Sequence, residues 1–271
     1  MKTLHILRFA VAMSCATLGG TAMAQACSQM IASGNPDYPP FLWRNPQDES
    51  KLLGANVELM QWLAREIGIP IDVRYVGSWA RVQEEVRHGK VDLIAGAFFT
   101  VPRLEYMDYF YPAFQAARTV IWTRAGHGFP FQQWSDLKGK QGLTVINNSF
   151  GEDFDRYAKD ELTIQTVPRL DQALRMLSVG RTDYVVYEEN PALAFAARLG
   201  ISGLKASTTA VSNENLYVTF SHKSPCNTGE IRGRIARALN KLQKDAGMKP
   251  ILENALRNWR RQAPEAGSPQ S

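Results

Sequence analysis

The sequence predicts two doubly wound α/β lobes, because one order of secondary-structure elements occurs twice along the chain. Each unit alternates strand, helix, strand, helix and strand, which is typical of parallel sheets covered by helices. The units also share a short motif, GKVDLI at residues 89–94 and GRTDYV at residues 180–185. In both, a glycine ends a helix and an apolar strand follows, so the repeat is visible in the residues themselves.

The elements of each unit follow from apolar periodicity and from glycine stops. Apolar side chains recur at helical spacing between Asn56 and Ile67, and Gly68 follows as a helix stop. The first unit is expected to hold a strand over 30–34, a helix over 56–67, a strand over 71–76, a helix over 78–88 and a strand over 91–96. The second is expected to hold a strand over 143–147, a helix over 152–159, a strand over 162–167, a helix over 170–179 and a strand over 183–187.

Three later elements are expected to return to the first lobe. They are a strand over 211–220, an amphipathic helix over 231–242 and a helix over 249–260. Residues 263–271 are small, polar and proline-containing, and predict a disordered tail.

The first 24 residues have the pattern of a secretory signal peptide. Lys2 and Arg8 precede an apolar run that ends at Leu18, and small residues lead to a cleavage site after Ala24. The run is about half of the roughly twenty residues that a membrane-spanning helix needs. We therefore expect cleavage and export, with the mature chain free in the periplasm.

Two cysteines remain after such cleavage, Cys27 and Cys226. Export into an oxidising compartment favours a disulfide between them, which would tie the start of the chain to its last third. The alternative is lipidation of Cys27 as a new N-terminus. Residues 24–26 lack the leucine expected before a lipidated cysteine, which favours the disulfide.

Composition argues against several functional classes. The formal net charge is +5, and basic residues are scattered among acids without a basic run, so neither nucleic acid nor a membrane surface is an expected partner. The chain has no Gly-x-Ser-x-Gly elbow, Walker loop or His-Glu-x-x-His helix, and its histidines are widely spaced. We therefore expect a binding protein without metal or cofactor, and not an enzyme.

Polar residues at strand ends predict a ligand site in the cleft between the lobes, since such sheets bind ligands beyond the carboxyl ends of their strands. Arg103 follows one strand end, where Thr100 could cap a turn, and its guanidinium suits a carboxylate. The loop over 148–151 opens a helix whose N–H groups suit an anion. An ordinary surface arginine and a simply capped helix are the alternatives.

Aromatic and acidic residues complete the expected site. Tyr38 and Trp79 lie beside other strand ends and suit an apolar stem or an ammonium group, although aromatic side chains more often fill a core. Glu188 and Glu189 follow a strand of the second lobe on an expected loop. One of them could pair with a ligand ammonium, although adjacent loop carboxylates are usually solvated.

Taken in order, several short motifs resemble the bacterial extracellular solute-binding proteins of the polar amino acid type (family 3), which deliver ligands to ABC importers. The motifs are YPPF at 38–41, Gly54, GKVDLI at 89–94, Thr100-x-x-Arg103, MDY at 107–109 followed by Tyr111-Pro112, DLKGK at 136–140 and GRTD at 180–183. The resemblance implies a type II periplasmic-binding-protein-like fold with a two-strand hinge. It places residues 25–118 and 212–262 in the first lobe and 119–211 in the second.

The resemblance also implies partners and residue roles. The partners are a small polar ligand, an amino acid or related carboxylate, and a membrane ABC permease, with the protein itself a monomer. Carried over by position, Arg103 holds the ligand α-carboxylate, Tyr38 and Trp79 sandwich its stem, and Glu188 meets its α-amino group.

Four positions depart from the family pattern. Phe98 stands where serine is common, and Phe150 follows Ser149 where threonine is common. Glu188 replaces an aspartate, and Asn56 replaces an acidic residue. We expect the two phenyl rings to shrink the pocket and weaken generic amino-acid recognition.

Two further functional classes stay open. A periplasmic dehydratase-like enzyme on the same fold could use Glu188 as a general acid. A sensory or accessory protein could pass ligand occupancy to a membrane partner. The residues do not name the ligand or decide between a permease and a sensor, and fold does not fix function.

Overall fold

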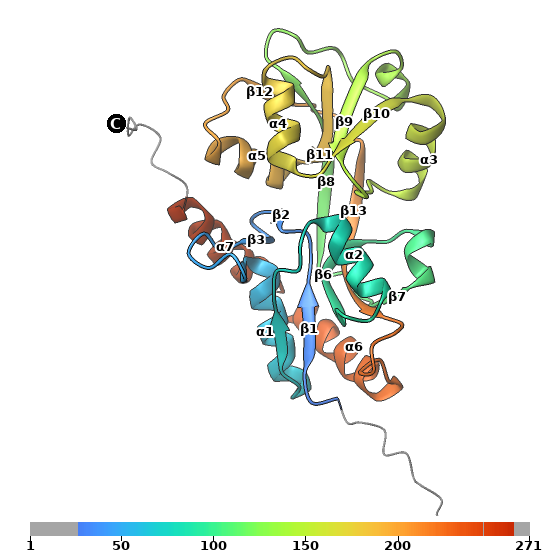
Figure 1. The fold of residues 1–271 in the computed structure, drawn as a ribbon, viewed down its shortest axis with the longest axis vertical. Coiled ribbons are helices and arrows are strands. Elements are labelled where there is room, and N and C mark those ends of the chain that lie inside the picture. Colours follow the sequence, from blue (N-terminus) through green and yellow to red (C-terminus); the bar gives the residue numbers. More distant parts are fainter. Residues whose placement is uncertain (1–26, 246, 263–271) are drawn as a thin grey trace, which may run out of the picture.

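The computed structural model describes residues 27–245 and 247–262, and it shows two α/β lobes joined by two long strands (Figure 1). The joining strands are β8 (Gln115–Arg124) and β13 (Ser212–Ser221), which pair antiparallel. The expected lobe boundaries stay a prediction; they fall where Thr119 pairs with Ser212. The signal peptide and the tail predicted from the sequence lie outside the described residues.

The first lobe, the lower one in Figure 1, is built on the sheet order β5-β1-β6-β13. Strand β1 pairs parallel with β5 and β6, and β13 runs antiparallel to β6. Its elements are β1 (Met30–Ser33), β2 (Asp37–Tyr38), β3 (Leu42–Arg44), β4 (Leu52–Leu53), α1 (Ala55–Ile67), β5 (Ile71–Val73), α2 (Trp79–Arg87), β6 (Leu93–Phe98), the 3-10 helix η1 (Val101–Glu105), β7 (Met107–Tyr109), α6 (Gly229–Lys244) and α7 (Lys249–Gln262).

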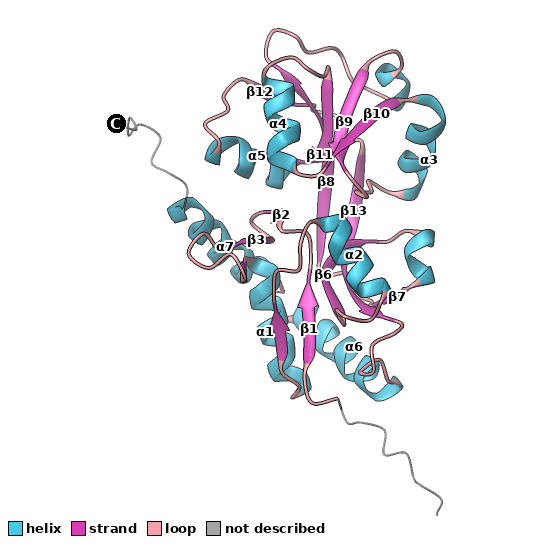
Figure 2. Ribbon diagram, in the orientation of Figure 1, coloured by secondary structure: helices cyan, strands magenta, loops and turns pink. Residues whose placement is uncertain are grey.

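The second lobe has the order β10-β9-β11-β8, with the parallel strands β9, β10 and β11 and the antiparallel β8. Its elements are the 3-10 helix η2 (Trp134–Leu137), β9 (Gln141–Val145), α3 (Glu152–Glu161), β10 (Thr163–Val167), α4 (Leu170–Ser178), β11 (Tyr184–Glu188), α5 (Glu189–Arg198) and β12 (Leu204–Ala206). Helices flank the sheets of both lobes (Figure 2), so the two-lobed α/β prediction is confirmed.

The repeated motif ends a helix and fixes a neighbouring strand in each lobe. Gly89 and Gly180 have φ angles of 73° and 74°, the left-handed region that favours glycine at a helix end. The motif aspartates also correspond. The Asp92 carboxylate accepts the Ile31 amide at the start of β1 (2.7 Å), and Asp183 accepts the Gln141 amide at the start of β9 (2.7 Å). Each aspartate thereby fixes the neighbouring strand.

The predicted disulfide is present between Cys27 and Cys226, whose Cα atoms lie 5.0 Å apart. It ties the residues before β1 to the segment that leads into α6, and so joins two distant parts of the first lobe. Among the described residues, no helix combines the length and the apolar composition that crossing a membrane requires.

One α-helix and the two 3-10 helices, η1 and η2, were not predicted from the sequence. Residues Glu189–Arg198 form α5 directly after β11, so the expectation that Glu188 and Glu189 lie on a loop is wrong. Glu188 ends the strand and occupies the N-cap position of α5. The segment has no glycine or serine turn between strand and helix, so the usual signal of a helix start is absent.

Candidate functional site

The cleft between the lobes narrows to a cavity of about 20 Å³, room for roughly one water molecule. It lies at the carboxyl ends of β6 and β11, where the sequence predicted the site. Its lining comes from both lobes and consists of Asn35, Tyr38, Trp79, Gly96, Ala97, Phe98, Arg103, Asn148, Glu188 and Leu216.

The structure brings together five of the eight predicted site residues at this cavity: Tyr38, Trp79, Phe98, Arg103 and Glu188. Trp79 begins α2 after its N-cap Ser78, and Phe98 ends β6. Tyr38 and Phe98 also belong to the buried apolar cluster of the second lobe. The lobes therefore meet through apolar rings that surround a few polar groups.

Arg103 is the cation of the cavity and is only 6% exposed. Its guanidinium donates to the Phe98 carbonyl (2.9 Å) and to the Asn147 carbonyl (3.3 Å), and it stands 5.3 Å from the centre of the Trp79 ring. It forms no ion pair with any residue that the structure describes. A buried guanidinium held by carbonyls alone keeps its charge available for an anion.

Three buried polar atoms of lining residues have no hydrogen-bond partner among the described residues. They are Tyr38 Oη in the first lobe, and Asn148 Nδ2 and Glu188 Oε2 in the second. The Asn148 amide lies near enough to Glu188 to oppose the rise of its pKa, but the two atoms fall outside hydrogen-bond geometry. Buried polar groups are nearly always hydrogen-bonded, so three orphans around one cavity need an explanation. Both lobes therefore contribute unused hydrogen-bonding capacity to this cavity.

Burial raises the pKa of Glu188 to about 8, although the nearby Asn148 amide and the charge of Arg103 oppose the rise. The carboxyl group is therefore mostly protonated at neutral pH and can donate as well as accept. Burial, with Glu188 nearby, also holds the pKa of Tyr38 well above its usual value, so its hydroxyl stays neutral.

Glu188→Gln should remove part of the pH dependence of stability. Because the pKa of Glu188 is about 8 in the folded protein and has its ordinary value of 4.5 in the unfolded chain, the folded state holds the extra proton between these limits, and wild-type stability falls as pH rises through this window. Glutamine stays neutral throughout. We expect the variant to gain at least about 1 kcal/mol over wild type between pH 5 and pH 8.5, or about 2–4 °C in calorimetry.

Glu189→Gln is the matched control for this prediction, because Glu189 is partly exposed and pairs with Arg118 (2.8 Å). It should leave the pH slope in place. Parallel melting curves for wild type and Glu188→Gln over the whole range would contradict the raised pKa.

The remaining predicted residues lie elsewhere. Thr100 and Ser149 line a wider opening of about 490 Å³, which Arg103, Gln83 and Asn147 also line. The ring of Phe150 packs 6.2 Å from Phe154 and 6.4 Å from Tyr187, in the core of the second lobe. Phe98 faces the cavity, so only one of the two phenyl rings expected to shrink the pocket lies at its wall.

In the loop before α3, two donors bond to a side chain of the helix itself. The Asp155 carboxylate accepts the Phe150 amide (2.9 Å) and the Ser149 hydroxyl. The N-cap residue of α3 is Gly151, and no side chain caps the helix, so the structure does not have the capped helix that was the alternative interpretation. Asp155 lies inside α3, and its carboxylate turns back to the loop before the helix, not to the first helical amides.

Sequence reasoning did not predict Asn35, Gln83 and Asn147 as residues of the site. Gln83 lies one turn after Trp79 on the same face of α2, so helical spacing from Trp79 could have found it. Asn147 is the one described non-glycine residue with positive φ, at 58°. Asparagine tolerates this conformation, but no local pattern marks the position.

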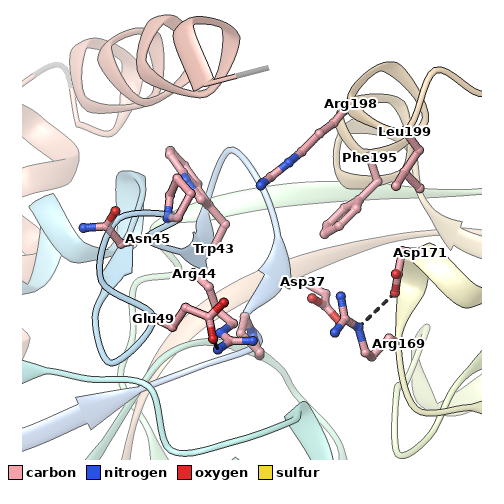
Figure 3. A pocket seen from close by; sticks show the side chains of 12 residues that line it. Asp37, Trp43, Arg44, Asn45, Glu49, Arg169, Asp171, Phe195, Arg198 and Leu199 are labelled. Carbon is pink, nitrogen blue, oxygen red and sulfur yellow. Dashed lines mark hydrogen bonds and ion pairs between the residues drawn. The ribbon is translucent and has the colours of Figure 1, made fainter. Parts of the chain in front are cut away.

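A second pocket of about 370 Å³ lies between the lobes, near α4 and α5 (Figure 3). Burial raises the pKa of Asp37 there to about 6, although the nearby Arg169 charge opposes the rise. Arg169 pairs with Asp171 (2.9 Å), and Arg44 pairs with Glu49. These four charges are paired within each lobe, whereas Arg198, which also lines the pocket, lies 5.0 Å from the centre of the Trp259 ring and forms no ion pair with a described residue.

Residues 30–258 match the family described as bacterial extracellular solute-binding proteins, family 3. The chain belongs to this family. Its members are solute-binding proteins, and a curated relative, the L-cystine-binding protein TcyA of Bacillus subtilis (strain 168), is 22% identical over 214 residues, which are 79% of this chain and 76% of the relative. The family predicted from the short motifs is thereby confirmed.

Solved structures agree with this family 3 fold. A histidine kinase sensor domain with similarity to periplasmic binding proteins has a TM-score of 0.72 at 21% identity, covering 84% of this chain and 96% of that one. An ancestral arginine-binding protein bound to arginine has a TM-score of 0.71 at 21% identity, covering 84% and 97%. These likenesses establish the two-lobed type II fold. Within the described residues, no group of three or more metal-ligating side chains could hold a metal ion.

Proposed function

We propose that this chain is the substrate-binding component of an ABC importer, works in the periplasm after removal of residues 1–24, and binds an amino acid or related carboxylate between its lobes. The observation that carries the proposal is the meeting of Arg103 with three unpaired polar atoms, contributed by both lobes, at one cavity. Each unpaired buried group costs about 1–3 kcal/mol. A ligand that satisfies groups of both lobes therefore stabilises the closed form over the open one.

The roles follow from charge and position. Arg103 binds the ligand carboxylate, and Tyr38 and Trp79 contact its apolar stem. Glu188 contacts the amino group of the ligand at the opposite wall of the cavity. The cavity is far smaller than a ligand. The lobes therefore move apart about β8 and β13 to admit the ligand and then close on it. A membrane permease recognises the closed form.

A thermal-shift panel of amino acids, small carboxylic acids, polyamines and sugars tests the proposal. A ligand at 100 times its dissociation constant adds about 2.7 kcal/mol to the stability of the folded protein. We expect a shift from one class of amino acid or carboxylate, with the compound recovered unchanged. Conversion of the compound to a product would instead support a dehydratase-like enzyme, and no shift from any of them would contradict the proposal.

Proton release on binding tests the role of Glu188. An ammonium group beside Glu188 favours its charged form, so an amino acid that binds at pH 7 should expel most of one proton. Titration calorimetry in buffers of different ionisation enthalpy measures this number. A carboxylate of similar size without an amino group should release none. Equal proton release by the two compounds would remove Glu188 as the partner of the amino group.

A further inference from the structure

Three side-chain donors of the first lobe converge on one carbonyl oxygen of the second lobe. The acceptor is the main-chain oxygen of Asn147, and the donors are Trp79 Nε1 (3.1 Å), Gln83 Nε2 (3.3 Å) and the Arg103 guanidinium (3.3 Å). A carbonyl oxygen has two lone pairs, so three donors are more than it needs. These bonds link the lobes directly.

The donors are held in place independently of Asn147. Gln83 is buried, and the Tyr106 hydroxyl donates to its Oε1 (3.2 Å), which turns the amide nitrogen toward the cleft. Trp79 follows the N-cap at the start of α2, and Arg103 is fixed by the Phe98 carbonyl. The three donors therefore form a preorganised group in the first lobe.

A ligand in the cleft changes this arrangement. Pockets for small molecules typically measure about 300–1,000 Å³, whereas the cavity between Arg103 and Glu188, where the proposed ligand lies, is about 20 Å³. The opening of about 490 Å³ beside it is lined by Gln83, Arg103 and Asn147. The lobes must stand further apart when a ligand lies between them, which draws the Asn147 carbonyl away from its donors. Trp79 Nε1 and the Arg103 nitrogen bonded to Asn147 then lose this acceptor, and Gln83 Nε2 keeps only the Trp79 carbonyl (3.5 Å), unless the ligand supplies an oxygen.

The rest of the cavity is also richer in donors than in acceptors. Asn148 Nδ2 can only donate, and the Tyr38 hydroxyl can donate. Arg103 carries a full positive charge, and Glu188 is the single acidic side chain that lines the 20 Å³ cavity, while Glu84, Glu152 and Asp155 line the neighbouring opening. A basic ligand side chain would find few acceptors here, whereas a second carboxylate would find several donors.

We propose that Trp79, Gln83 and Arg103 form a three-donor subsite for a carboxylate oxygen, that the Asn147 carbonyl competes with the ligand for this subsite, and that the ligand is an acidic amino acid or a dicarboxylate of similar size. The proposal rests on the proposed function, because it assumes a ligand between the lobes. It adds Gln83 as a binding residue and makes the competition between Asn147 and the ligand part of closure.

Titration calorimetry of the purified protein tests the ligand class. Glutamate, aspartate and succinate are compared with arginine and lysine, and we expect the best acid to bind at least tenfold more tightly than either base. Gln83→Glu should weaken binding of that acid at least tenfold, because an acceptor replaces a donor. Gln61→Glu, an exposed position on α1, is the matched control and should bind as wild type does. Tightest binding of a base, or unchanged affinity of Gln83→Glu, would overturn the proposal.

A measurement without ligand separates failure of this proposal from failure of the proposed function. Trp79→Phe keeps an aromatic ring, although a smaller one, but not the N–H, and Gln83→Leu keeps a similar volume but not the amide. Small-angle X-ray scattering should give a larger radius of gyration for the double variant than for wild type, with circular dichroism confirming that both are folded. An unchanged radius would overturn the role of Asn147. Binding of no compound, with an increased radius, would reject the proposed function and with it the ligand class, and would leave only the contact between the lobes at Asn147.

Should the double variant not fold, Gln83→Leu alone provides the same comparison with a smaller expected increase in radius. Gln61→Leu on α1 is its control and should keep the wild-type radius. An equal radius for Gln83→Leu and Gln61→Leu would again count against the contact with Asn147.

Discussion

Replacing Cys27 and Cys226 together by alanine should lower the free energy of unfolding by about 5 kcal/mol. The two residues are 199 positions apart in the chain, so the bond closes a long loop and removes much of the conformational freedom of the unfolded state. The loss should be visible as a shift of the urea unfolding midpoint. The loss of stability should affect the first lobe, since both cysteines belong to that lobe.

The single variants give an internal control. Either alanine substitution alone breaks the same bond, so each should cost nearly as much as the double substitution. Wild-type protein under reducing conditions should lose a similar amount. A loss below about 1 kcal/mol in the double variant would contradict the stabilising role of the bond.

Arg103→Ala should weaken ligand binding by about 2–4 kcal/mol, or roughly 30-fold to 1,000-fold, because it removes a charged and buried contact to the carboxylate. The fold should persist, since Arg103 bonds two main-chain carbonyls and no carboxylate. Titration calorimetry measures the affinity, and circular dichroism checks the fold.

Two variants sharpen the Arg103 prediction. Arg103→Lys keeps the charge but loses the planar pair of donors, so its affinity should lie between wild type and Arg103→Ala. Arg65→Ala, at an exposed position on α1, should bind as wild type does. Wild-type affinity in Arg103→Ala would remove this residue as the anchor of the ligand.

Most of the fold could be predicted because its signals are local. Gly89 and Gly180 end their helices in the left-handed conformation, and the aspartate three residues later fixes a neighbouring strand in each lobe. The cysteine pairing followed from export to an oxidising compartment and from the two cysteines that remain after signal cleavage. Helix α5 escaped because it starts at Glu189 without a turn residue before it.

The site could be predicted only in part, because its contacts are not local. The positions of the predicted strand ends identified Arg103 and Glu188 as candidate site residues, and both line the cavity. The sequence could not show that the Asp155 carboxylate would accept a hydrogen bond from the Phe150 amide, since two interpretations of that helix start fit the same residues. The bond from Gln83 to Asn147 depends on how two lobes meet, which no local pattern encodes.

A crystal structure of the protein with its tightest-binding carboxylate would locate the ligand directly. We expect ligand density between Arg103 and Glu188, with polar contacts to both lobes and with Asn147 withdrawn from Trp79 and Gln83. Ligand density in the second pocket, between Trp43 and Phe195 (Figure 3), or contacts to one lobe alone, would contradict binding at the Arg103 cavity.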